Sequence, residues 1–389
     1  ITKSVIRSTM AKDKIYNGRT SEFLFFASPE YLIKNPIPHN LGSNDETPLI
    51  DKLFLDWVGE EEKIRLYELF SYSISPDRFM QRIFAFVGGG SNGKGTCINN
   101  LLVKFIGKDN IVSSEMKEIA ENQFETATLF GKLVCIMGEV SYDDLKNTNQ
   151  LKKIAGEDLL RFCFKGKTPF TDENTALGIC LTNSLPTTPD KSLGFYRKWN
   201  IIDFPNQFVE IKENLISKIS EEEFENLAKK CLRILGELYK NQRFTNEGDF
   251  DERIKRYEER SNPVLRFVDE YCEEVEGENI ILREFTNQCN EYLKSKHLRV
   301  LTAQQIGKIL RNEGFLVGNR KIFEVSSVVI LNLKFKNYRN YRNYQNSVLD
   351  LHKETIEKFD SSDSYNSLKF DSSNSYNSFG DKIEIIKIK

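Results

Sequence analysis

The nine residues at positions 88–96, GGGSNGKGT, limit what this chain can fold into more than any other part of its sequence. They follow the apolar run IFAFV (83–87) and precede the helical run CINNLLVKFI (97–106). A glycine-rich turn of this pattern between a strand and a helix is typical of a phosphate-binding loop. Its glycines let backbone N–H groups turn toward phosphates, which also face the positive end of the following helix. The predicted nucleotide-binding residues are Gly88, Gly89, Gly90, Ser91, Asn92, Gly93, Lys94, Gly95 and Thr96.

Lys94 supplies the positive charge that such a loop needs, because its ammonium group can neutralise the β- and γ-phosphates of ATP. The next position departs from the usual pattern. It normally holds Ser or Thr, whose hydroxyl binds Mg²⁺, but here it is Gly95, and Thr96 follows one place later. Either Thr96 reaches the ion or water fills the vacant ligand position. The expected cofactors are therefore ATP and Mg²⁺, with Thr96 as a candidate metal ligand.

Five short β-type runs predict the strands of one sheet: 83–87, 110–114, 133–137, 177–182 and 199–204. Helical or loop segments separate these runs. Near-continuous apolar strands are typical of a parallel sheet that is covered on both faces. The sequence therefore predicts an α/β fold built on a five-stranded parallel sheet.

Polar residues at the ends of these runs are the candidates for catalysis. Glu139 follows the run LVCIM, where a carboxylate can hold the magnesium shell or orient an attacking water. Since Gly138 takes the place of a second acid, we assign water activation to Glu139 and count it as a candidate metal ligand. Asn183 follows the run LGICLT, where its amide can sense the γ-phosphate. Arg197 and Lys198 precede the last run and are candidates for a cation donated across a subunit boundary.

Composition excludes several classes of protein. The chain has 389 residues, is 39% hydrophobic and 29% charged, and has a net charge of -2, which is typical of a soluble globular protein with two or three domains. It contains neither a long uncharged apolar stretch nor a signal peptide, so we expect no membrane association. Its seven cysteines are widely spaced without a CxxC pair, which predicts buried thiols in a reducing cytoplasm. Because it begins Ile-Thr-Lys, we expect it to be part of a longer protein.

Changes in pattern along the chain predict five segments. Apolar residues recur at helical spacing over 49–72, after the turn-rich stretch NPIPHNLGSNDETP. The near-repeat KFDSSDSYNSLKFDSSNSYNSF has too little apolar surface to fold alone. The predicted segments are an N-terminal helical region with a linker (1–75), an ATPase core (76–207), a helical connector (208–261), a winged-helix-like domain (262–336) and a low-complexity, disordered tail (337–389).

The fourth of these segments is predicted from three helical runs, PVLRFVDEYCEE, ILREFTNQCNEYLKSK and TAQQIGKILRNEG. Two β-type runs follow, around 321–324 and 328–333, which is the order of the winged helix-turn-helix. Residues 293–343 carry 11 Lys and Arg against 2 Asp and Glu. Such a basic patch is what contact with a phosphate backbone requires. A solvated lysine-rich face is an equal alternative on charge alone.

Five motifs occur in order between residues 48 and 335: NGKGT, LVCIMGEV, LKKIAGEDLLRFCFKGKTPF, CLTNSLP and FYRKWNIIDFP. Their order resembles that of the superfamily 3 helicases, specifically the primase-helicases of poxviruses, phages and plasmids. The third and fourth motifs are quite specific. They separate this interpretation from that of a generic nucleotide-binding enzyme.

The resemblance implies an AAA+-like motor that forms a hexameric ring and moves on single-stranded DNA. It implies Lys94 and Thr96 at the phosphates and Glu139 as the Walker B acid. It further implies Asn183 as the polar sensor and Arg197 as the arginine finger.

The resemblance also implies that residues 151–170 contain the loop that tracks DNA in the central channel. The candidates for phosphate contact there are the cations Arg161, Lys165 and Lys167. Family members often carry a primase domain upstream. Residues 1–46 show no such catalytic constellation, so any primer synthesis is expected to belong to sequence outside this chain.

These expectations together describe an ATP-dependent DNA helicase that acts as a ring on single-stranded and forked DNA during plasmid or viral genome replication. Two alternatives stay open. An ATP-regulated, origin-binding initiator would bind duplex DNA with sequence preference and separate no strands. A P-loop kinase would transfer a phosphoryl group as a monomer and would not depend on DNA.

Overall fold

A computed structural model describes most of the chain between residues 35 and 336. The described ranges are 35–138, 145, 147–208, 215–296, 298–322 and 325–336. Three short strands, β1 (Ser8–Met10), β2 (Ile15–Asn17) and β3 (Glu22–Leu24), are described as backbone and pair as an antiparallel sheet. The predicted tail at 337–389 and the candidate acid Glu139 lie outside the described residues.

One parallel sheet forms the centre of the fold, with strand order β10-β4-β9-β6-β5. Its strands are β4 (Ile83–Val87), β5 (Ile111–Ser114), β6 (Val134–Met137), β9 (Leu177–Thr182) and β10 (Trp199–Asp203). All five residues of β4, which lies between β10 and β9, are buried. This architecture confirms the predicted α/β fold, and each of the five predicted runs contains one strand.

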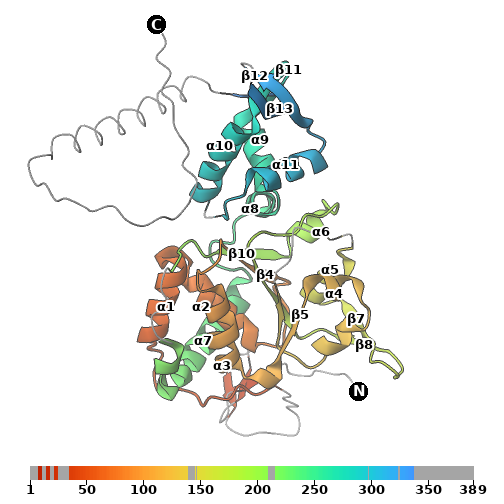
Figure 1. The fold of residues 1–389 in the computed structure, drawn as a ribbon. Coiled ribbons are helices and arrows are strands. Elements are labelled where there is room, and N and C mark those ends of the chain that lie inside the picture. Colours follow the sequence, from red (N-terminus) through yellow and green to blue (C-terminus); the bar gives the residue numbers. More distant parts are fainter. Residues whose placement is uncertain are drawn as a thin grey trace, which may run out of the picture. The chain divides into compact units, whose positions relative to one another are not determined.

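Both faces of the sheet are covered, because alternate residues of β4 enter two different apolar clusters. Phe84 and Phe86 pack into one cluster, and Ala85 and Val87 pack into the other. Figure 1 shows the helices grouped accordingly on the two sides of the sheet. The first side holds α1 (Pro48–Val58), α2 (Glu60–Ile74), the π-helical η1 (Thr96–Leu102), α3 (Val103–Ile106) and α7 (Glu221–Asn241).

Shorter helices cover the second face. They are α4 (Met116–Glu121), α5 (Asn149–Ala155), α6 (Leu193–Tyr196) and α8 (Phe250–Ser261). Single turns η2 (Lys108–Asn110), η3 (Glu125–Leu129) and η4 (Leu215–Lys218) join the larger elements. A two-stranded hairpin, β7 (Leu159–Phe162) with β8 (Phe170–Glu173), follows α5.

Helix α7 packs against α2 and contributes to the core, although the sequence suggested a connector. Its predicted apolar stripe is buried: Phe224, Leu227, Ala228, Cys231, Leu235 and Leu238. The irregular segment before α1 also packs here, since His39 stacks on Phe224 with ring centroids 4.9 Å apart, and the backbone N–H of Gly42 donates to the carbonyl of Glu225. The turn-rich stretch expected to be a linker is therefore partly fixed to the core.

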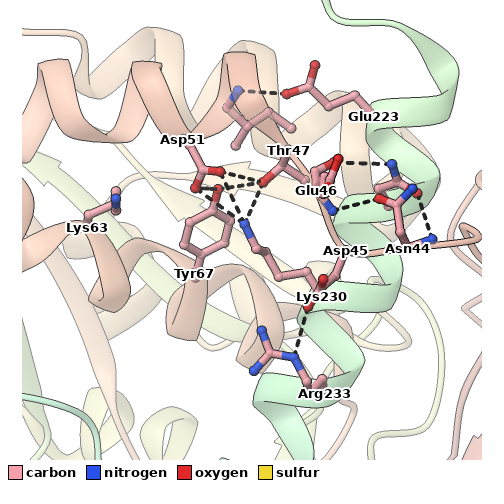
Figure 2. A network of polar contacts seen from close by, with 12 residues as sticks. Asn44, Asp45, Glu46, Thr47, Asp51, Lys63, Tyr67, Glu223, Lys230 and Arg233 are labelled. Carbon is pink, nitrogen blue, oxygen red and sulfur yellow. Dashed lines mark hydrogen bonds and ion pairs between the residues drawn. The ribbon is translucent and has the colours of Figure 1, made fainter.

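A network of polar contacts joins α1, α2 and α7 (Figure 2). Lys230 of α7 donates to the hydroxyl of Thr47 at 2.7 Å and to the carboxylate of Asp51 at 3.3 Å. Its ammonium group also lies 4.3 Å from the ring centroid of Tyr67, whose hydroxyl donates to Asp51. The Glu223 carboxylate accepts the Ile50 N–H at the start of α1. These contacts fix α1 to the other helices of this face.

The C-terminal part of the described chain contains the three predicted helices and the two strands after them, with a further strand between the first and second helices. It runs α9 (Pro263–Tyr271), β11 (Cys272–Ile281), α10 (Leu282–Ser295), α11 (Ala303–Asn312), β12 (Val317–Ile322) and β13 (Val325–Phe335). The three strands form an antiparallel sheet in the order β11-β13-β12. The first helical run was predicted to continue through Glu274, which was wrong. A strand begins at Cys272, since pairing with Phe335 of β13 overrides the local helical pattern.

The seven cysteines are all buried and none forms a disulfide, which confirms the prediction of buried thiols. Burial raises the pKa of the Cys135 thiol to about 12. Among the helices of the described ranges, none has the length and apolar character needed to cross a membrane.

Candidate functional site

The glycine-rich loop lies between the end of β4 and the helical segment that continues as η1. Its backbone adopts positive φ angles at Gly90, Ser91 and Gly93, of 97°, 48° and 88°. The segment after β10 braces it, because the N–H of Phe208 donates to the carbonyl of Ser91 at 2.8 Å. The amide of Asn92 donates to the carbonyl of Phe204 at 3.2 Å. The loop is therefore attached to the neighbouring strand by both backbone and side-chain bonds.

Two glycines of the loop cannot be replaced without displacing a neighbour. A Cβ on Gly93 would lie 2.4 Å from Cδ1 of Trp57, and the positive φ angle there also favours glycine. A Cβ on Gly88 would lie 2.6 Å from the carbonyl oxygen of Phe204. Trp57 belongs to α1, so this helix forms a wall against which the loop folds. The sequence contains the tryptophan but nothing in its pattern shows that it contacts the loop.

Lys94 is buried at the start of the helix, with 8% of its surface exposed. Its ammonium group donates to the carbonyl of Gly88 at 2.5 Å and to the amide oxygen of Asn183 at 3.4 Å. The structure therefore brings together two residues predicted separately, 89 positions apart in the chain. They meet because β4 and β9 are adjacent parallel strands, so the loops after them share one edge of the sheet.

A pocket of about 520 Å³ lies at this edge of the sheet. Its lining comes from the glycine-rich loop and the carboxyl ends of β5, β6 and β9, where open α/β sheets usually bind ligands. The lining residues are Gly90, Ser91, Asn92, Gly93, Lys94, Gly95, Thr96, Asn99, Ser113, Ile136, Gly138, Leu181, Thr182 and Asn183. Gly88 and Gly89 are the two predicted nucleotide-binding residues outside this lining.

The pocket offers few protein ligands for a divalent cation. Thr96 is exposed and lines the pocket, while Gly95 has no side chain and Glu139 lies outside the described residues. Within the described ranges, no three His, Cys, Asp or Glu side chains gather as a metal site. Mg²⁺ at nucleotide sites commonly keeps several waters and uses one or two protein ligands together with phosphates. The Thr96 hydroxyl fits that requirement as a single ligand.

A second hollow, of about 410 Å³, is lined by Glu68 and Thr245 among other residues. The Glu68 carboxylate already accepts bonds from the N–H and the hydroxyl of Thr245. Burial raises the pKa of this carboxyl. Because its acid is already satisfied by the protein, we assign the candidate site to the pocket at the glycine-rich loop.

Arg197 lies at the opposite edge of the sheet from the pocket. It precedes β10, whose first residue Trp199 pairs with Ile83, the first residue of β4. A five-residue strand at about 3.3 Å per residue separates the two edges by about 15 Å. Arg197 is exposed, and the structure does not bring it to the glycine-rich loop of its own chain.

Lys198, the second candidate for a donated cation, is buried with 4% of its surface exposed. Its ammonium group donates to the amide oxygen of Gln81 at 2.8 Å. Burial, followed by the nearby charge of Arg197, lowers its pKa to about 8. A buried lysine with an internal partner cannot reach a neighbouring molecule, so Arg197 is the better candidate of the two.

The predicted DNA-tracking segment contains the hairpin of β7 and β8. Aromatic packing fixes its base, because Phe130 contacts Phe162 and Phe170 with ring centroids 5.2 and 5.0 Å apart. The candidate cations Lys165 and Lys167 lie in the turn and are exposed. Arg161 is also exposed, on β7. Exposed acids accompany it in the same segment: Glu157, Asp158, Asp172 and Glu173. Positive charge is therefore concentrated at the tip of the hairpin.

A family model matches residues 86–198 and is described as a family of unknown function, DUF5906. The match spans the loop, the hairpin and the residues up to Lys198, which is less than half of the chain. No curated protein matches the sequence.

Two kinds of solved structure are similar to the chain. The apo C-terminal region of NrS-1 is 14% identical, with 75% of this chain and 77% of that chain covered and a TM-score of 0.40. A JCV helicase bound to an acetamide compound is also 14% identical, with 66% and 68% covered and a TM-score of 0.28. At these scores neither protein assigns an activity to this chain.

The contact of Gly93 with Trp57 leads to a stability prediction. We expect Gly93→Ala to lower the free energy of unfolding more than Gly131→Ala, measured by urea denaturation. Gly131 has a φ of 72° with no atom near a built Cβ, so alanine there meets only backbone strain of about 1–2 kcal/mol. At Gly93 the clash with the indole should add about 1–3 kcal/mol.

A second substitution separates the backbone strain at Gly93 from the clash with the indole of Trp57. Trp57→Leu should recover part of the loss in the Gly93→Ala background, since the smaller side chain leaves room for the new Cβ. Equal losses for the two alanine variants would show that Trp57 does not restrict the loop.

Proposed function

We propose that this chain is an ATP-dependent DNA helicase that works as a hexameric ring during plasmid or viral genome replication. The observation that carries the proposal is the pocket at the carboxyl edge of the sheet, where buried Lys94 meets Asn183 beside the glycine-rich loop. Phosphate binding is the chemistry that such a loop supports best. Single-stranded and forked DNA are the proposed substrates.

Each predicted site residue has a proposed role. The N–H groups of residues 90–96 and the ammonium group of Lys94 bind the phosphates of ATP, which supplies the phosphoryl group for hydrolysis. Thr96 holds Mg²⁺ with the phosphates, and Glu139 orients the attacking water and contributes to the metal shell. Asn183 senses the γ-phosphate through its contact with Lys94. Gly88 contributes its carbonyl to Lys94, and Gly89 contributes a flexible backbone.

The ring is supported by the position of Arg197. An exposed cation at one edge of the sheet cannot act on a nucleotide at the opposite edge of the same chain, but a neighbouring copy can receive it. The exposed Leu193, with 64% of its surface accessible, lies four residues before it on α6. An apolar side chain beside the cation is suited to contact with another subunit.

We also propose the chain divisions at 1–75, 76–207, 208–261, 262–336 and 337–389 as functional segments.

The winged arrangement favours one alternative, an initiator that binds duplex DNA and is regulated by ATP without unwinding. The exposed residues Lys308 and Arg311 of α11 and Arg320 of β12 support it. The buried thiols, none of which forms a disulfide, support a cytoplasmic location.

The first test is nucleotide turnover and strand displacement. Lys94→Ala should reduce ATP hydrolysis at least a hundredfold, because the phosphates lose the cation of the loop. Glu139→Gln should still bind ATP but hydrolyse it at a similarly reduced rate. A forked DNA substrate with ATP should be unwound by the unsubstituted chain alone. A normal hydrolysis rate in Glu139→Gln would remove this residue from the mechanism, and duplex binding without unwinding would favour the initiator.

The second test concerns the hairpin. Replacing both Lys165 and Lys167 with alanine should weaken binding to single-stranded DNA and lower the slope of log affinity against log salt by about 1.4, or 0.7 per lost phosphate contact. Lys153→Ala is the matched control, because Lys153 is exposed on α5 outside the hairpin. Affinity should be measured by fluorescence anisotropy at several salt concentrations. An unchanged slope in the double variant would exclude these lysines from DNA contact.

The third test asks whether Arg197 acts on a neighbouring subunit. Arg197→Ala and Lys94→Ala should each be inactive alone, whereas mixtures should recover part of the ATPase rate. Recovery is expected because a subunit with an intact loop can then meet a subunit with an intact Arg197. Activity should be followed across mixing ratios, with each single variant as its own control. No recovery at any ratio would contradict the proposed role of Arg197.

A further inference from the structure

The turn between α10 and α11 passes beside the glycine-rich loop. A Cβ built on Gly89 would lie 3.8 Å from both the Cα and the backbone nitrogen of Arg299. A side chain at Gly89 would therefore touch the backbone of Arg299, which lies close beside the first half of the loop. Arg299 itself is exposed. The winged-helix region thus places the backbone of an arginine beside the loop of the same chain.

The surrounding residues fix the backbone at this position. Leu298 and Leu301, on either side of Arg299, are both buried. The side chain of Asn290 accepts the N–H of Leu301 and donates to its carbonyl, each at 2.9 Å. The N–H of Leu298 donates to the carbonyl of Leu293 at 2.8 Å. Arg299 is therefore presented from an anchored turn.

The pocket has too little positive charge of its own to balance a nucleoside triphosphate, so a further cation would stabilise the bound nucleotide. Among the described residues that line the pocket, Lys94 is the one with a positive charge, and it already donates to two protein oxygens. A nucleoside triphosphate carries several negative charges, which one partly engaged ammonium group balances poorly. An arginine side chain offers a planar fork of donors that matches two phosphate oxygens at once.

We propose that Arg299 binds the terminal phosphate of the nucleotide held by the glycine-rich loop of its own chain. The inference rests on the proposed nucleotide-binding function and deepens it. Because Arg299 belongs to the winged-helix region, binding at the loop and the position of this region are energetically linked. A nucleotide that binds Arg299 therefore favours the arrangement in which the turn lies against the loop.

The test compares ATP with ADP by isothermal titration calorimetry in the presence of Mg²⁺. Arg299→Ala should weaken ATP binding about tenfold or more, since a charge-assisted bond is lost, and should change ADP binding much less. Arg299→Met keeps the apolar stem but not the charge, so it should behave like the alanine variant. Arg299→Lys should be intermediate. Arg283→Ala, at an exposed arginine of α10 in the same region, should bind both nucleotides normally.

The outcomes separate this inference from the proposed function. If the unsubstituted chain binds no ATP, the proposed function fails and the inference fails with it. If the unsubstituted chain binds ATP and Arg299→Met binds it equally well, the inference alone is overturned. Equal weakening of ATP and ADP would exclude the terminal phosphate as the partner. Thermal unfolding of each variant should show an unchanged midpoint, which separates lost contact from lost folding.

Discussion

The packing of Trp57 against Gly93 is the contact on which the candidate site depends. The loop can take its backbone path only with no side chain at Gly93, and the indole gives it a wall to fold against. Trp57 is held by α1, which Lys230 in turn joins to α2 and α7 through Asp51 (Figure 2). The helices before and after the sheet in sequence therefore act together as the support of one loop.

The parallel sheet separates two cations of the proposed site. Its carboxyl edge collects the glycine-rich loop, Lys94 and Asn183, because adjacent parallel strands end on the same side. Its amino edge carries Arg197, one short strand away. A strand of this length cannot be bridged by any side chain. In the proposed ring, Arg197 can therefore act only on the nucleotide of a neighbouring subunit.

The sequence predicted the features that depend on local pattern. The five strands, the glycine-rich loop and the three helices of the winged region were all found from apolar periodicity and turn residues. The sequence did not predict the features that depend on contacts between residues distant in sequence. Strand β11 exists because Cys272 pairs with Phe335, and the role of Trp57 appears only when α1 meets the loop. The burial of Lys198, which decides between two neighbouring cations, likewise follows from tertiary packing.

The scarcity of charge in the pocket constrains how such a site can work. Since Gly95 and Gly138 have no side chains, Lys94 is the one charged side chain among the described residues that line the pocket. A triphosphate beside a single ammonium group keeps most of its negative charge unbalanced, so further cations would stabilise it. The two arginines that can supply them, Arg197 and Arg299, belong to elements outside the loop. If both bind phosphate, nucleotide affinity depends on the neighbouring subunit and on the winged-helix region at once. Because the pocket itself holds one charged side chain, loss of the terminal phosphate would then release both the neighbouring subunit and the winged-helix region.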